Sequence, residues 1–265
     1  VQDSALALAI SQAGGLGSLP CAMLSLEALR SALALIHAQT DKPVNMNFFC
    51  HTQPQPDEQR ELAWRAVLAA YYAEAGIDPT SIAPAPERMP FSVEVADVLE
   101  AFRPALVSFH FGLPAPDLLA RLRSWGTKIL SSATTLAEAL WLEAQGVDAI
   151  IAQGLEAGGH RGMFLSDDVS TQLGTFALIP QIVQAVNVPV IAAGGIADTA
   201  GIRAALALGA QGVQLGTAYM LCPEATTGAL HRAALQSQAA QYTAQTNLFT
   251  CLLNTSPSPR DGLLS

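Results

Sequence analysis

Short apolar runs alternate with amphipathic segments along most of this chain. Residues 149–152 are apolar throughout and lead through Gln153 into a glycine-rich turn, which is typical of a buried parallel strand that ends in a loop. Residues 25–37 instead carry leucines and an isoleucine at helical spacing, with Ser25 placed to cap the first turn. The pattern therefore predicts strands and helices in alternation.

The same criteria, applied to the whole chain, predict seven strands separated by helices. After a first helix at residues 4–12, the expected strands are 15–19, 44–49, 105–111, 128–131, 149–152, 189–193 and 212–216, with helices at 25–37, 57–76, from 92, from 116, 135–145, 175–186 and 198–208. This βα repeat indicates a parallel α/β fold. With one further strand expected before Val1, it predicts a TIM (β/α)8 barrel whose first strand is missing.

Composition supports one large core. Of the 265 residues, 51% are hydrophobic and 13% are charged, enough apolar material for one domain of barrel size. The net charge of −9 and the lack of dense Lys and Arg clusters make a nucleic-acid partner unlikely in physical terms. The apolar runs are too short to span a membrane, and nothing resembles a secretion signal. The four cysteines lack metal-site or disulfide-framework spacing, so we expect no metal and a cytoplasmic protein.

Chemistry is concentrated in the turn after residues 149–152. Gly154, Gly158 and Gly159 can bring backbone N–H groups close to a ligand, and His160 follows them directly, beside Arg161. A histidine just past a strand end can handle a proton near neutral pH, or it can simply be a solvated loop residue. Spacing alone leaves both interpretations open.

The last two predicted strands both end in glycine. Gly194 and Gly195 precede Asp198, a candidate helix cap, and Gly216 and Thr217 follow the final strand. These turns are neighbours in a barrel, where backbone donors and a helix N-terminus can converge on a phosphate. Gln153 and Gln214 are expected to point into the same mouth, where an amide can bond a heteroaromatic ring. Together these features predict a phosphorylated cofactor with a polar ring.

Two asparagines interrupt the predicted strand 44–49. An unpaired amide inside a buried strand is costly, by about 1–3 kcal/mol. For Asn47, nearer the strand end, contact with a ligand and a bond to a neighbouring loop are both open; for Asn45 we favour the bond to a neighbour.

Three motifs, AQGLEAGGHRG, VPVIAAGGIAD and GAQGVQLGTAYMLCPE, resemble those of the nitronate monooxygenases, which are FMN-dependent barrels. The resemblance covers residues 14–249 and implies His160 as the catalytic base. It implies flavin contacts at Asn47, Gln153, Gly158, Gly159, Gly194, Gly195, Gln214, Leu215, Gly216 and Thr217.

The implied reaction oxidises a nitronate with O2 to a carbonyl compound and nitrite. His110, at a strand end in SFHFG, is the next candidate for the mouth and for substrate contact, although we slightly favour a buried histidine bonded to backbone at this position. We expect His37, His51 and His231 at the surface. An enoyl-ACP reductase of the flavin type and a non-catalytic flavin or phosphate binder remain alternatives, and the sequence leaves the oligomeric state and any use of NAD(P)H open.

The two ends depart from the family pattern. The family begins with a strand and a Pro-Met-Ala-Gly turn, so roughly twenty residues are expected before Val1. At the other end, residues 251–265 resemble translated adapter sequence rather than the family's continuation. We therefore expect one flavin-binding barrel domain at residues 1–250, incomplete at both ends, followed by a non-native tail.

Overall fold

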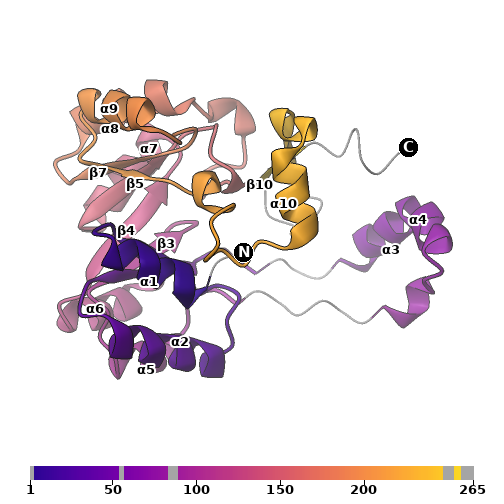
Figure 1. The fold of residues 1–265 in the computed structure, drawn as a ribbon, viewed down its shortest axis with the longest axis horizontal. Helices are drawn as coiled ribbons and strands as arrows, with labels where there is room; N and C mark the ends of the chain where they lie inside the picture. The colour runs from indigo at the N-terminus through magenta and orange to yellow at the C-terminus, as the bar shows by residue number, and fades with distance from the viewer. Residues whose placement is uncertain (1–2, 54–56, 83–88, 247–253, 258–265) are drawn as a thin grey trace.

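Seven parallel strands form one curved sheet in the computed structural model, which describes residues 3–53, 57–82, 89–246 and 254–257 (Figure 1). The strands lie side by side in chain order, and β1 and β8 stand at the two edges of the sheet in this part of the chain. They are β1 (Gly17–Pro20), β2 (Val44–Phe49), β3 (Leu106–His110), β4 (Lys128–Ala133), β5 (Ala149–Gln153), β7 (Val190–Ala193) and β8 (Gly212–Gln214). The prediction of a TIM-type α/β barrel is confirmed.

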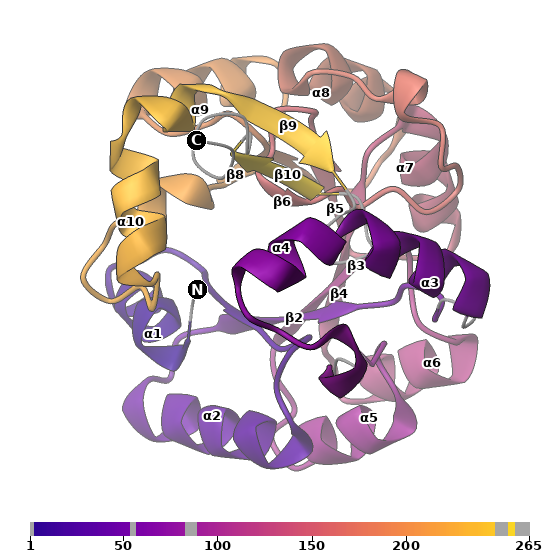
Figure 2. The same ribbon diagram turned by 90° about the vertical axis from the view of Figure 1, so that its right-hand side faces the viewer.

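Helices cover the outside of this sheet (Figure 2). They are α1 (Ser4–Gln12), α2 (Leu26–Gln39), α5 (Val93–Glu100), α6 (Pro116–Ser124), α7 (Leu136–Ala144), α8 (Thr175–Ala185) and α9 (Thr199–Ala207). A further helix, α10 (Ala229–Gln236), buries no side chain and stands between the barrel and the helical residues 58–74 in Figure 1. Ser25, Ser92, Thr135 and Asp198 each accept a backbone N–H at the start of a helix, as N-cap residues do. Short 3-10 turns occur at η1 (Pro79–Ser81), η2 (Val169–Thr171), η3 (Thr217–Tyr219) and η4 (Gln238–Gln241).

The two faces of the sheet bury different side chains. On the outer face, Val107, Ile129, Ile150 and Val190 are at most 1% exposed and belong to the main core with the surrounding helices. A second, smaller apolar cluster of Leu130, Ala149, Ile151 and Ala193 comes from the alternate positions of the strands. Because side chains alternate along a strand, this second set faces the barrel interior.

The interior changes character toward the carboxyl ends of the strands. Asn47 lies opposite Ser108, and Phe49 lies opposite His110, on adjacent strands. Gln153 lies opposite Ala193, which in turn lies opposite Gln214. The polar ends of these strands therefore share one mouth, which is where TIM-barrel proteins place their active sites.

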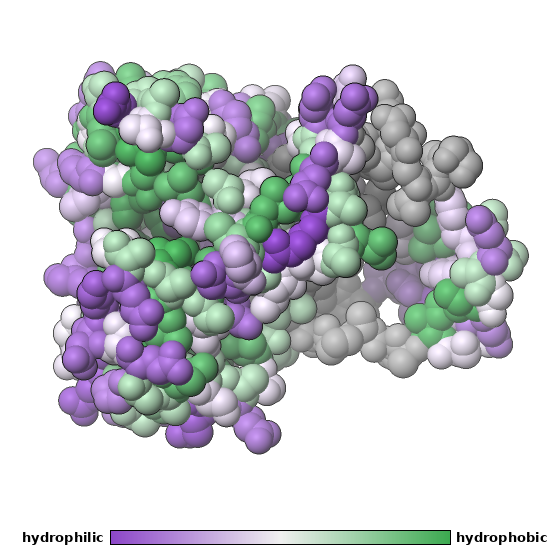
Figure 3. All heavy atoms as spheres, in the orientation of Figure 1, coloured by the Kyte–Doolittle hydropathy of each residue, from purple (hydrophilic) through white to green (hydrophobic). Residues whose placement is uncertain are grey.

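A helical insertion between β2 and β3 stands away from the sheet (Figure 1). The single helix predicted at residues 57–76 is instead α3 (Glu58–Val67) and α4 (Ala69–Glu74), with a break at Leu68. Neither helix buries a side chain, and Leu62 and Val67 are 67% and 64% exposed. Figure 3 accordingly shows apolar surface on this insertion.

A small antiparallel sheet lies over the barrel mouth. It joins β6 (Gly159–His160), β10 (Asn254–Pro257) and β9 (Thr243–Thr246), in that order. Residues 251–265 were expected to take no part in the fold, but Asn254–Pro257 pairs with both other strands. The remainder of 251–265 lies outside the described residues, and the division into a domain at 1–250 and a non-native tail stays a prediction.

No helix in the described ranges is both long enough and apolar enough to cross a lipid bilayer.

Candidate active site

Gln153, the last residue of β5, closes the loop that carries His160. Its Nε2 donates to the backbone oxygen of His160 at 2.9 Å, and its Oε1 accepts from the N–H of Gly162 at 2.8 Å. The expected contact of this side chain with a cofactor ring stays a prediction. One donor and one acceptor position of the amide bond the loop, so that the backbone on both sides of Arg161 is fixed to the strand end.

His110, at the end of β3, contacts the same loop. Its Nε2 lies 3.0 Å from the backbone oxygen of His160, and its Nδ1 lies 3.0 Å from Oγ of Ser132. Since a carbonyl oxygen can only accept, Nε2 carries the proton, and Nδ1 then accepts from the Ser132 hydroxyl. Burial lowers the pKa of His110 to about 4, and the nearby His160 and Arg161 act in the same direction. His110 is therefore neutral at pH 7 and holds His160 in place through its backbone.

Aromatic rings surround the imidazole of His160, which is half-buried. The Phe49 ring centroid lies 5.1 Å from it and the Phe111 centroid 6.0 Å, both edge-on. Phe111 has φ +67°, an unusual value for a bulky residue, and this backbone turn sets its ring beside His110 and His160. One side of His160 is thus apolar, while its backbone is tied to the polar strand ends.

Arg161 is buried, with 2% of its surface exposed. Its Nη1 donates to the backbone oxygen of Gly154 at 2.6 Å, and its Nη2 donates to that of Gln153 at 2.7 Å. From the sequence, Arg161 could attract an anion, but a solvated loop position was the favoured interpretation. That interpretation is wrong, because the guanidinium donates to two backbone carbonyls at the end of β5. Burial lowers the pKa of Arg161 to about 10, against the opposing effect of Glu138 and Glu156, so the side chain stays charged at pH 7.

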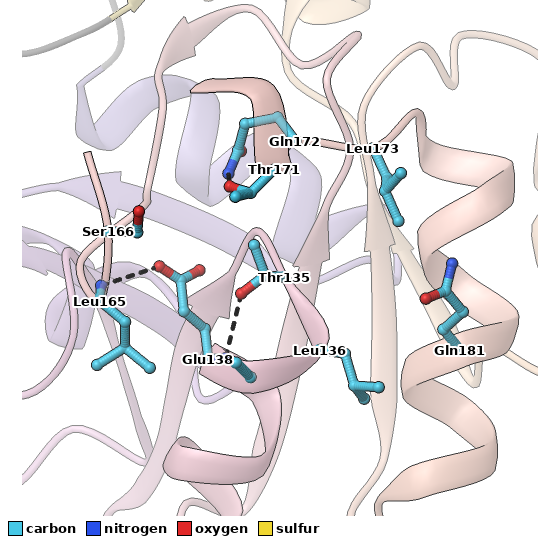
Figure 4. Close-up of a pocket in the computed structure, with 10 residues that line it drawn as sticks. Thr135, Leu136, Glu138, Leu165, Ser166, Thr171, Gln172, Leu173 and Gln181 are labelled. Carbon is cyan, nitrogen blue, oxygen red and sulfur yellow. Dashed lines mark hydrogen bonds between the residues drawn. The ribbon is translucent and has the colours of Figure 1, made fainter. Parts of the chain in front are cut away.

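Glu138 fastens the other end of the loop. This carboxylate on α7 is 1% exposed. Its Oε1 accepts the backbone N–H groups of Phe164 and Leu165, the second of which is marked in Figure 4. Its Oε2 accepts both the N–H and the hydroxyl of Thr134. A pocket of about 410 Å³ beside it, between α7 and α8, shares no lining residue with the predicted flavin set.

The turns after β5, β7 and β8 meet at the opposite side of the mouth. A Cβ added to Gly158 would lie 3.2 Å from Oγ1 of Thr217, a tight contact that would require the threonine side chain to shift slightly, so these two turns lie close together. Gly194 and Gly195 adopt φ +119° and +66°, values that glycine accepts without strain. The structure therefore brings together Gly158, Gly194, Gly195 and Thr217, as the sequence predicted, although it does not test what they bind.

This side of the mouth presents unused backbone donors. Within the described residues, the N–H groups of Gly195, Gly216 and Thr217 donate no hydrogen bond, and all three residues are exposed. Asp198 caps α9 a few residues later, so the positive end of that helix lies close by. An anion such as a phosphate fits this arrangement of donors.

The remaining predicted contacts lie at different depths. Gln214 is exposed at the end of β8, whereas the Leu215 side chain packs against the main core and leaves only its backbone for a ligand. Asn47 donates to Oγ of Ser108 at 2.8 Å. Asn45 donates to Ser18 and Ser108, at 2.9 and 2.7 Å, which confirms the bond to neighbours.

Sequence reasoning missed several residues that shape this site. Ser132 bonds His110, and Glu138 bonds the backbone at the end of the loop that carries His160; the polar strand end SSATT was the available signal for Ser132. His51 was expected at the surface but is buried to 9% exposure, with its ring 6.1 Å from that of Phe111. His51, two residues after β2, therefore packs against the aromatic rings at the mouth rather than lying in solvent.

Comparison with known proteins then decides the family. The model of the family described as nitronate monooxygenase matches residues 1–251. The chain belongs to the nitronate monooxygenase family. A nitronate monooxygenase from Paraburkholderia phytofirmans is 47% identical over 251 residues, or 93% of this chain and 68% of the relative, and one from Pseudomonas aeruginosa is 44% identical over 254 residues, or 93% and 70%.

Solved structures agree with this family assignment. A nitroalkane oxidase from Streptomyces ansochromogenes superposes with a TM-score of 0.88 at 35% identity, over 97% of this chain and 74% of the other. FabK from Thermotoga maritima gives 0.70 at 27% identity, over 96% and 66%. The predictions of a nitronate monooxygenase-type oxidoreductase and of a barrel fold are thus confirmed, and the family is flavin-dependent.

Proposed function

We propose that this member of the nitronate monooxygenase family oxidises alkyl nitronates with O2 to carbonyl compounds and nitrite, using FMN as its flavin. The observation that carries the proposal is the division of the barrel mouth. A half-buried histidine is held by its backbone on one side, and exposed backbone N–H groups gather on the other. A proton acceptor and an anion cradle are what a flavin enzyme acting on carbon acids needs.

FMN suits this mouth better than FAD. The N–H groups of Gly195, Gly216 and Thr217, with the start of α9, form one compact group of donors for one phosphate. The sequence offers no G-x-G-x-x-G motif after a strand that would hold a second phosphate. The chemistry that the flavin would supply when bound is electron transfer from the substrate to oxygen. In this proposal Asn47, Gln153 and Gln214 contact its ring.

In this proposal His160 takes a proton from the carbon of a neutral nitroalkane or stabilises a nitronate that arrives already ionised. Phe49 and Phe111 cover one side of the imidazole with their rings. Gln153 and His110 both donate to the His160 backbone oxygen, so the imidazole is presented by a fixed main chain. Arg161 is a positioning residue, since both of its bonded nitrogens serve backbone carbonyls.

Replacing His160 tests this role. The variant His160→Asn should retain flavin but lose turnover of neutral nitroalkanes by about 10²–10⁴-fold, because deprotonation at carbon needs a base. Turnover of pre-formed nitronates should fall much less, since they need only to be held beside the flavin. Nitrite release measured with both substrates checks this, and an equal loss on both would instead make His160 a binding residue.

The identity of the flavin can be read directly. Mass spectrometry of the cofactor released from purified protein should give FMN. Recovery of FAD would contradict the single-phosphate cradle, while recovery of FMN from a protein that releases no nitrite from nitronates would separate the cofactor assignment from the reaction.

A further inference from the structure

A second pocket lies at the end of the barrel opposite the mouth. It has a volume of about 520 Å³, within the size range of small-molecule sites, and sits between α2, the first residues of β2 and residues 102–105, which follow α5. Its lining includes Leu33, Ile36, Val44 and Met46, each no more than 6% exposed. The inner part of the pocket is therefore apolar.

The rim of this pocket is polar and carries more cations than anions. Lys42 and Arg103 line it together with His37 and one carboxylate, Asp41. The Lys42 Nζ donates to the backbone oxygen of Gln12 at 2.9 Å, which leaves two of its protons available. The Arg103 side chain makes no hydrogen bond or ion pair within the described residues. A positively charged rim is notable in a chain of net charge −9.

The backbone at Arg103 is unusual. Its φ is +42°, and its N–H donates to the oxygen of Leu99 at 2.7 Å, which ends α5. Glycine is the residue that normally occupies such a left-handed helix end, because a Cβ is disfavoured there. The chain thus carries a strained arginine where glycine would fit freely, and strained positions of this kind often serve a function.

We propose that this pocket binds an aliphatic carboxylate, with its hydrocarbon chain between α2 and β2 and its carboxylate on the Arg103 guanidinium. Guanidinium and carboxylate match as a two-pronged, charge-assisted pair. The site is separate from the nitronate mouth, because Val44 begins β2 whereas Asn47 and Phe49, near its other end, belong to the mouth. Binding of the carboxylate at this site requires neither bound flavin nor catalytic turnover.

Titration with octanoate, followed by methyl NMR, tests the proposal. The methyl resonances of Ile36 and Val44 should shift in a saturable way, while those of Ile151, inside the barrel, should not. Hexanoate should bind about 15-fold more weakly, because each buried methylene contributes about fourfold. Octylamine should fail to bind there. Equal shifts of Ile36 and Val44 with octylamine, or no shift with octanoate, would overturn the proposal.

The variant Arg103→Gly separates binding from folding. Glycine accepts φ +42°, so the melting temperature should stay equal or rise, while octanoate should bind about 10–100-fold more weakly. Arg203→Ala, which removes an exposed arginine on α9, is the matched control and should leave octanoate binding within twofold. If Arg103→Gly lowers stability, Arg103→Asn repeats the test, since Asn also tolerates this conformation. Unchanged affinity in a folded variant of either kind contradicts the site.

Discussion

The two sides of the barrel mouth are built in opposite ways. At the ends of β3 and β5, side chains bond to backbone until most polar groups are used: Gln153, His110 and Arg161 all serve the loop that carries His160. At the ends of β7 and β8, glycines leave backbone N–H groups exposed, and the side chains contribute little. One side is a closed network, and the other is an open set of donors.

This contrast indicates that the side at β3 and β5 is preorganised, whereas the side at β7 and β8 has donors available for a ligand. Buried polar groups that are already satisfied hold a reactive residue in one position. Exposed N–H groups at a helix N-terminus gain partners only when an anion arrives. We therefore expect damage to the first side to reduce stability and catalysis, and damage to the second side to reduce flavin binding.

The largest expected loss of stability comes from Arg161→Met. This change removes the charge that two backbone carbonyls and nearby Glu138 and Glu156 depend on, and it should lower the free energy of unfolding by about 3–5 kcal/mol. Urea denaturation measures this. Arg203→Ala, an exposed arginine elsewhere, serves as control and should change stability by less than about 0.5 kcal/mol. A loss below about 1 kcal/mol for Arg161→Met would mean that the loop does not depend on the guanidinium.

A smaller effect should appear as pH dependence from His110. The folded pKa of about 4 lies below the ordinary value of 6.5, so between these values the unfolded chain binds more protons at this site than the folded chain does. Above about pH 6.5, protonation of His110 therefore costs the folded state nothing. As the pH falls from 6.5 toward 4, the free energy of unfolding decreases by up to about 3 kcal/mol because of this residue.

The variant His110→Gln isolates the pH dependence that comes from His110, because glutamine can donate to the His160 oxygen but does not titrate. The free energy of unfolding of both proteins should be measured from pH 4 to 7 and plotted against pH. The two slopes should differ by an amount that corresponds to the uptake of up to one proton on unfolding. Identical slopes would mean that His110 titrates normally in the folded state.

The repeating pattern of the chain was sufficient to predict most of the fold. Apolar runs bounded by Gly, Pro and Asp located every strand of the main sheet, and the caps at Ser25 and Asp198 were readable because capping is a local interaction. The break at Leu68 could not be predicted from the sequence, since residues 57–76 carry no Gly or Pro inside the helical pattern. Strand pairing by Asn254–Pro257 is a long-range contact that no local signal in the sequence indicates.

The site was predictable to a different degree on each side. Glycines at 194, 195 and 216 act through their own backbone, so the sequence alone indicated a cluster of donors. The bonds of Gln153 and Arg161 to backbone depend on a loop that folds back on β5, and local spacing indicated neither set of bonds. Burial of a charged residue against carbonyls requires knowledge of the tertiary structure.

The most direct test of the division between the two sides is the FMN dissociation constant of two variants, measured by quenching of flavin fluorescence. Gly195→Ala places a Cβ at φ +66°, where it would lie 3.1 Å from Cβ of Glu156, and should weaken FMN binding about tenfold, equivalent to about 1.4 kcal/mol. His160→Asn should leave the same constant within twofold. Weakened binding in His160→Asn with unchanged binding in Gly195→Ala would contradict the account.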